Sequence, residues 1–199
     1  MAVVALIAVG WLYMALPEWL SFRPRWALLA VVILLLVPTI AFHQAGKLSL
    51  NRIFGLTVNA VVTLAVIWSV ILLVRALPEH KEPPVLLLRS AGSLWIANML
   101  IFALWYWHLD AGGPNQRGAK SGHTEGAFLF PQMAPGAGED ATWSPHFIDY
   151  MFLAFNTSTA LSPTDAPVLS RWAKLLMMVQ SVISLTIIVL LAARAVNIL

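Results

Sequence analysis

Six side chains that carry oxygen ligands lie close together near the C-terminal end of the sequence. They are Thr157, Ser158, Thr159, Ser162, Thr164 and Asp165. Hydroxyl oxygens and backbone carbonyls that no helix uses can replace part of the hydration shell of a cation. The segment is therefore predicted to be filter-like and ion-coordinating, with monovalent cations as possible ligands and Asp165 attracting them at its mouth.

The same residues fit a structural role, and the sequence leaves that alternative open. Thr157, Ser158 and Thr159 would equally cap a short helix and hydrogen-bond to neighbouring helices. Asp165 would equally pair with Arg171 or Lys174.

A short apolar helix is predicted directly before these residues, from Ser144 to about Asn156. Ser144 suits the N-cap, Pro145 suits the first helical position, and Asp149 lies near the positive end of the helix dipole. About 12 residues give a length of about 18 Å, which is too short for a ~30 Å hydrocarbon core. We therefore expect a re-entrant half-helix whose negative C-terminal end points at the hydroxyl groups.

Three residues of the last apolar helix are predicted to line the vestibule of a pore. Gln180 and Ser184 share one face of that helix, and Met177 lies one turn before Gln180. Polar residues of this kind also form hydrogen bonds between membrane helices, and the sequence does not decide between the two roles.

The sequence shows few residue patterns that would support catalysis, metal binding or cofactor binding. It contains no cysteine, and its five histidines are scattered at helix ends and in loops without helical pair spacing. It shows no Ser-His-Asp grouping and no phosphate loop. We therefore expect no enzyme activity, no metal site and no cofactor. The formal net charge of +3 is small and dispersed, so nucleic acid is not expected as a partner.

The composition predicts an all-α membrane protein. Hydrophobic residues make up 60% of the 199 residues and charged residues 11%. Long apolar runs predict five transmembrane helices, with the re-entrant helix between the fourth and the fifth. The predicted spans are about 2–16, 26–42, 53–77, 85–109 and 171–197. The expected surroundings are a lipid bilayer, as in the inner (plasma) membrane of a cell.

Two regions are expected within this chain. Residues 1–84 form an N-terminal three-helix region. Residues 85–199 contain an outer helix, the loop 110–144, the re-entrant helix with its filter-like loop at 145–167, and an inner helix at 170–197. Phe128 to Pro131 are expected to pack back from the loop onto the helices.

The C-terminal region resembles the pore module of potassium-channel-like proteins. Aligned without gaps to the family pattern, Phe155, Thr157, Thr159, Asp165, Pro167 and Arg171 fall in comparable places. The stretch Leu161-Ser162-Pro163-Thr164 stands where that family has its glycine-containing filter. Glycine permits the backbone geometry that aims successive carbonyls into the pore, so the resemblance does not imply potassium selectivity.

The whole chain also resembles a family of uncharacterised bacterial integral membrane proteins. The resemblance lies in the segments ALWYWHLDAGGP, FLFPQM and the tail FNTSTALSPTD followed by RWAKLLMMVQS. It implies a bacterial inner-membrane location and no particular activity.

The sequence therefore favours a channel-like membrane protein with non-standard ion selectivity. One pore loop cannot enclose a pathway, so a homo-oligomer is expected, with a tetramer favoured. The alternative is a non-conducting membrane scaffold or subunit whose re-entrant loop is structural or binds a partner.

Overall fold

The protein is described by a computed structural model that places residues 1–76, 83–117, 126–133, 143–159 and 166–196. This part of the chain is helical and contains no β-strand beyond a single bridge. The α-helices are α1 (Ala2–Met14), α2 (Ala27–Gln44), α3 (Leu48–Ala76), α4 (Pro84–Leu109), α5 (Pro114–Arg117), α6 (Phe147–Thr159) and α7 (Arg171–Val196). Three single-turn 3₁₀ helices are η1 (Glu18–Leu20), η2 (Asp110–Gly112) and η3 (Pro131–Met133).

Four helices are long and apolar enough to cross a membrane, as expected for a multi-pass membrane protein. These segments are Ala27–Gln44, Leu48–Ala76, Pro84–Gly112 and Arg171–Ala193. The helix α1 is apolar but has only 13 residues, about 20 Å, so the prediction of five spans stays a prediction. The helix α3 starts at Leu48 and not at 53, because the turn after α2 is short and contains Gly46 with a φ of 68°, which glycine adopts readily.

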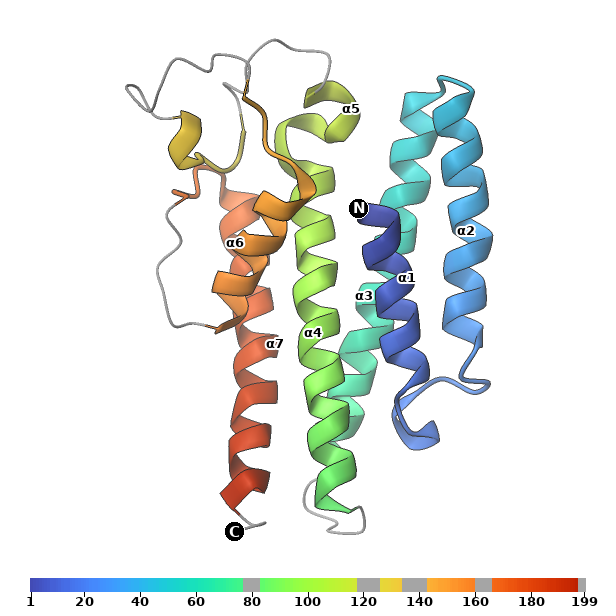
Figure 1. The fold of residues 1–199 in the computed structure, drawn as a ribbon, viewed down its shortest axis with the longest axis vertical. Coiled ribbons are helices and arrows are strands. Elements are labelled where there is room, and N and C mark those ends of the chain that lie inside the picture. Colours follow the sequence, from blue (N-terminus) through green and yellow to red (C-terminus); the bar gives the residue numbers. More distant parts are fainter. Residues whose placement is uncertain (77–82, 118–125, 134–142, 160–165, 197–199) are drawn as a thin grey trace.

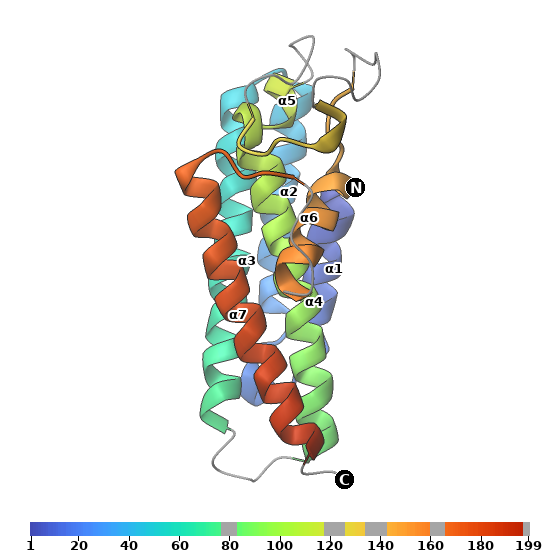
Figure 2. The ribbon, with the colours of Figure 1, turned by 90° about the vertical axis from the view of Figure 1, so that its left-hand side faces the viewer.

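The long helices form a bundle in which α4 is central. Figures 1 and 2 show α2, α3, α4 and α7 running roughly along the long axis of the molecule. The helix α4 contacts α1, α3, α6 and α7, whereas α2 packs on α1 and α3. Small residues such as Ser90, Ala91 and Ala97 are buried on α4, which allows close approach of its neighbours. The end where α2 and α4 finish and α3 and α7 begin is called the upper end below (Figure 1).

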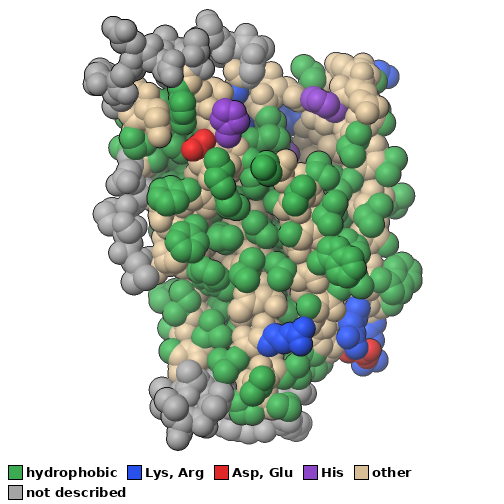
Figure 3. All heavy atoms as spheres, in the orientation of Figure 1, with side chains coloured by type: hydrophobic (Ala, Val, Ile, Leu, Met, Phe, Trp, Pro, Cys, Tyr) green, Lys and Arg blue, Asp and Glu red, His purple; other side chains and the backbone are tan. Residues whose placement is uncertain are grey.

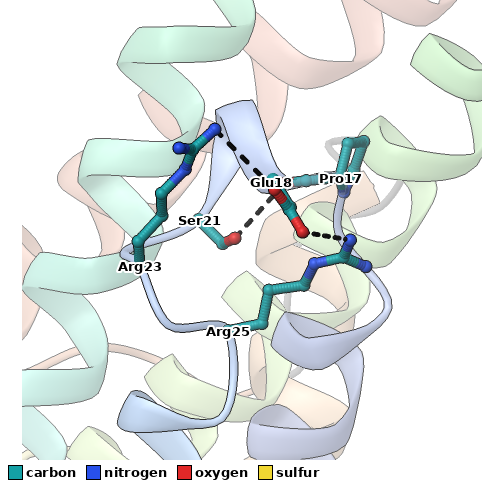
Figure 4. Close-up of polar contacts among 5 residues, drawn as sticks. All are labelled: Pro17, Glu18, Ser21, Arg23 and Arg25. Carbon is teal, nitrogen blue, oxygen red and sulfur yellow. Dashed lines mark hydrogen bonds and ion pairs between the residues drawn. The ribbon is translucent and has the colours of Figure 1, made fainter.

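A short connector links α1 to α2 at the opposite end of the bundle. Glu18 accepts a hydrogen bond from Arg25 at 2.8 Å and lies 3.7 Å from Arg23 (Figure 4). The Arg25 hydrogen bond and the charges of both arginines lower the pKa of Glu18. The connector is also fixed to the bundle, because the Ser69 hydroxyl of α3 donates to the Leu20 carbonyl at 2.6 Å.

A polar cluster fastens the upper end of α4 to α6. Asp110 is fully buried at the end of α4, and its carboxylate accepts hydrogen bonds from the Tyr150 hydroxyl and the Ala127 backbone N–H. Arg117 donates to the carbonyls of Trp107 and Asp110 at 2.9 and 2.8 Å. Burial lowers the pKa of Arg117, and Tyr150 and Asp110 oppose this shift. We call Asp110, Arg117 and Tyr150 the upper cluster.

Phe128 joins the chain that follows α5 to this cluster. Its side chain is fully buried and packs edge-on against Tyr106, Tyr150 and Trp172. A β-bridge pairs Phe128 with Val168, just before α7. This is the backward packing that the sequence predicted for 128–131, although the region 110–144 also contains the helical turns η2, α5 and η3.

Replacing Asp110 with asparagine is expected to destabilise the fold by about 2–3 kcal/mol, because the amide leaves one buried donor unsatisfied and removes a negative charge near Arg117. The loss in the free energy of unfolding is measured in detergent by adding increasing amounts of a denaturing surfactant. Asp149→Asn is the control, since Asp149 accepts one exposed backbone N–H at the start of α6, and its loss should stay below about 1 kcal/mol. Equal losses in the two variants would contradict the assigned role of Asp110.

Candidate functional site

The helix α6 carries the first part of the predicted filter-like region. It starts at Phe147, two residues after the predicted first position Pro145, and reaches Thr159. Its start is fixed by Asp149, whose carboxylate accepts the His146 backbone N–H at 2.7 Å. Phe147, Tyr150, Ala154 and Ser158 follow helical spacing and are buried, so α6 presents one face to the bundle.

The short helix lies beside two membrane-length helices. It packs on α4 and α7, which also pack on each other. Figures 1 and 2 show that α6 begins near the upper end, where α7 also begins, and stops partway along both neighbours. Its 13 residues correspond to about 20 Å. The C-terminal end of α6 therefore lies inside the length of the bundle and not at its surface end.

Gln180 of α7 holds the C-terminal end of α6. Its side chain is fully buried, and its amide donates to the Ala154 carbonyl and the Ser158 hydroxyl, both at 2.7 Å. The Tyr106 hydroxyl of α4 donates to the amide oxygen of Gln180 at 2.5 Å. One side chain thus joins α4, α6 and α7, and all of its hydrogen-bonding atoms are used.

Asn98, about two turns before Tyr106 on α4, extends this arrangement by one turn along α7, from Gln180 to Ser184. Its amide donates to the Ser184 hydroxyl at 2.8 Å and to the Gln180 carbonyl at 3.4 Å. Asn98 and Ser184 are both buried. We call the set Asn98, Tyr106, Ser158, Gln180 and Ser184 the central network. It lies within one chain and needs no second subunit to complete it.

The last carbonyls of α6 also receive hydrogen bonds from their neighbours. The Ser181 hydroxyl donates to the Thr157 carbonyl at 3.5 Å, and the Trp95 indole N–H donates to the Ser158 carbonyl at 3.4 Å. These carbonyls belong to the last turn of α6, which has no helical partner for them. Donors from α7 and α4 therefore cover part of the negative end of the α6 dipole.

The predicted site residues fall into three groups. Thr157 and Ser158 are buried inside the chain, and the Thr157 hydroxyl donates to the Leu153 carbonyl at 2.8 Å. Thr159 is half-buried, and its hydroxyl donates to the Asn156 carbonyl at 3.1 Å. Ser162, Thr164 and Asp165 lie outside the described residues.

The three residues predicted to line a vestibule share a face, but that face is turned into the chain. Gln180 and Ser184 are buried in the central network, and Met177 is half-buried against the hydrophobic core. The exposed face of α7 carries Leu175, Met178, Val179, Val182, Leu185 and Val189. The surface that α7 presents to lipid or to another subunit is therefore predominantly apolar.

Two side chains of α4 that help to hold α6, Tyr106 and Trp95, are not among the site residues predicted from the sequence. The Tyr106 hydroxyl is buried and donates to Gln180. The Trp95 indole N–H donates to the Ser158 carbonyl. Asn98, Phe102 and Tyr106 follow a four-residue spacing on α4, and this was the available signal that Tyr106 faces the same neighbours as Asn98.

The described residues contain no cluster of three or more His, Asp or Glu side chains that could hold a metal ion. The polar groups that this site offers are hydroxyl and carbonyl oxygens. They either coordinate a weakly bound cation or hydrogen-bond the helices to one another.

Comparisons of the chain with known protein families, with curated proteins and with solved structures found no match. The geometry defines a multi-pass helical membrane protein with a short helix held between α4 and α7.

Replacing Gln180 with leucine is expected to destabilise the bundle by about 2 kcal/mol. The substitution removes three buried hydrogen bonds, and single bonds of this type between membrane helices average below 1 kcal/mol. Surfactant-induced unfolding of the purified protein measures the change. Thr186→Val is the matched control, because its hydroxyl donates only to the Val182 carbonyl of the same helix. A Gln180→Leu variant as stable as this control would show that the central network does not hold α6.

Proposed function

We propose that this chain is a subunit of a channel-like protein of the plasma membrane, in which α6 is a re-entrant pore helix. The observation that carries the proposal is the placement of α6. It begins at the end where α7 begins, stops inside the bundle, and is held between α4 and α7 by Gln180. A short helix that ends at membrane depth needs protein or water around its free end.

In this proposal α4 is the outer helix and α7 the inner helix of a pore module. The spans α2, α3, α4 and α7 cross the bilayer, and α1 adds a short fifth crossing. Permeant cations would exchange hydration water for oxygens contributed by Thr159 and by Ser162, Thr164 and Asp165 in the segment that follows α6. The anchoring of α6 by the central network would keep those oxygens in place during conduction.

A pathway would require several copies of the chain around one axis, and four is the simplest number. The exposed residues of α6 include Ile148, Phe152 and Phe155, and α7 also exposes an apolar face. These surfaces are suitable for contact with lipid or with another subunit. Selectivity would be non-standard, since no glycine occupies the filter-like stretch 161–164.

A second candidate function is a non-conducting membrane scaffold or subunit. The observation that favours it is the covering of the α6 end by Ser181 and Trp95, together with the complete hydrogen bonding of Gln180 within one chain. Polar groups that are already satisfied have little to offer a passing ion. In this case the segment after α6 would be structural or would bind a partner.

The re-entrant path of α6 predicts that its start and the start of α7 lie on the same side of the membrane. The sequence contains no cysteine, so single cysteines introduced at His146 and at Arg171 would be the only thiols. Both are expected to react with a membrane-impermeant maleimide from the same side of sealed vesicles.

A cysteine at Arg23 is the control and should react from the opposite side, because the α1–α2 connector lies at the other end of the bundle. Labelling of His146→Cys and Arg171→Cys from opposite sides would rule out a re-entrant α6.

The channel proposal predicts that Thr159→Val changes cation flux through reconstituted vesicles several-fold while the assembly remains intact, because an oxygen at the pathway is replaced by a methyl group. Ion-selective dyes or electrodes measure the flux. Thr57→Val is the matched control, since its hydroxyl also donates to a carbonyl of its own helix, at 2.9 Å, but on α3.

The scaffold proposal predicts no flux in any variant. Flux that is equally insensitive to Thr159→Val and Thr57→Val would place the pathway elsewhere in the protein.

A further inference from the structure

A large cavity lies at the upper end of the bundle, on the side of α4 away from α6. Its volume is about 690 Å³, within the range of pockets that hold small molecules. It is enclosed by α1, α2 and α3 together with residues 107–108 and 112–116. Figure 3 shows the surface hollowed near the upper end, next to histidine and basic side chains. None of the residues predicted from the sequence to bind ions lines it.

The cavity has a polar rim and an apolar floor. The rim carries His43 from the end of α2, Ser49 and Arg52 from the first turns of α3, and Asn115 and Gln116 from α5. The floor is formed by Leu6, Leu36 and Val58, all of which are buried.

The rim and the floor differ in depth along the helices. Val58 lies six positions below Arg52 on α3, about 9 Å at the helical rise, and Leu36 lies about 10 Å below His43 on α2. His43, Ser49 and Arg52 lie at the ends of the membrane-length helices α2 and α3, which is the level of lipid head groups. The cavity therefore changes from polar to apolar in the same direction as one leaflet of a bilayer, and it does so within the ~15 Å hydrocarbon depth of that leaflet.

The electrostatics of the rim favour a negative group. Among the described residues that line the cavity there is no aspartate or glutamate. The Arg52 side chain has no hydrogen bond or ion pair within the described part of the chain. The N-terminal end of the 29-residue helix α3 adds the positive end of its dipole at the same place.

We propose that this cavity binds an anionic amphiphile, with a phosphate or carboxylate head group on Arg52 and an acyl chain on the apolar floor. A guanidinium group forms charge-assisted, bidentate hydrogen bonds with either kind of head group. The acyl chain removes apolar surface from contact with water or lipid head groups. The site is separate from α6 and stands whether or not the protein conducts ions.

The test uses the purified full chain in detergent and native mass spectrometry with three probes. The probes are a short-chain phosphatidic acid, a phosphatidylcholine with the same acyl chains, and inorganic phosphate. We expect phosphatidic acid to bind about 10-fold or more tightly than phosphatidylcholine, and inorganic phosphate not to bind at the same concentrations. If inorganic phosphate binds as well as phosphatidic acid, the acyl chain contributes nothing and the ligand is not an amphiphile. If the two lipids bind equally, the site does not select an anionic head group.

Two pairs of variants locate the binding. Arg52→Gln is expected to weaken phosphatidic acid binding about 10-fold, whereas Lys47→Gln, a neighbouring cation that does not line the cavity, should have little effect. Ile40→Trp, which fills the cavity, is expected to weaken binding of both lipids. Ile33→Trp, an exposed position of the same helix outside the cavity, is its control.

If Arg52→Gln and Lys47→Gln weaken phosphatidic acid binding equally, the lipid is attracted by surface charge in general. That result would contradict a specific site at Arg52. Unchanged lipid binding in Ile40→Trp, with a circular dichroism spectrum like that of the unaltered protein, would show that the lipid binds elsewhere.

Discussion

The burial of the Asp110 carboxylate is the constraint on which the α4–α6 side of the bundle depends. An isolated carboxylate away from water is very unfavourable, so it has to be surrounded by donors. Among the described residues, Tyr150 on α6 and the Ala127 N–H donate to the carboxylate, and Arg117 places a positive charge near it. Meeting this requirement brings the end of α4, the start of α6 and the chain at 126–130 together. Phe128 then fills the space among their aromatic rings.

A helix of 13 residues is marginally stable by itself, so α6 depends on its neighbours for its conformation. It is held at two heights. The upper cluster holds its first turns through Tyr150, and the central network holds its last turns through Gln180. Two attachments separated along one short helix fix both its position and its tilt. A pore helix and a structural re-entrant helix need the same rigidity, which explains why the geometry supports both proposals.

The sequence predicted the elements of the fold better than the contacts between them. Apolar length placed α2, α3, α4 and α7 within a few residues, and length also identified α6 as too short to span. Sequence spacing also put Gln180 and Ser184 on one face. It could not show which neighbour that face meets, because Gln180 and its partner Tyr106 are 74 residues apart. The role of Asp110 could not be predicted from the sequence either, since its donor Tyr150 lies 40 residues away.

The distribution of polar groups separates two parts of this molecule that experiments can address independently. The central network lies between α4, α6 and α7, and the cavity lies between α1, α2 and α3. Trp107 connects the cavity to the start of α6, because it lines the cavity, contacts Phe147, and lies 5.9 Å from the Arg117 guanidinium of the upper cluster. A substitution at Trp107 would therefore disturb both the cavity and the attachment of α6, and it could not assign a function to either. Arg52 and Gln180 each belong to only one of them, so their variants distinguish ligand binding in the cavity from the role of α6.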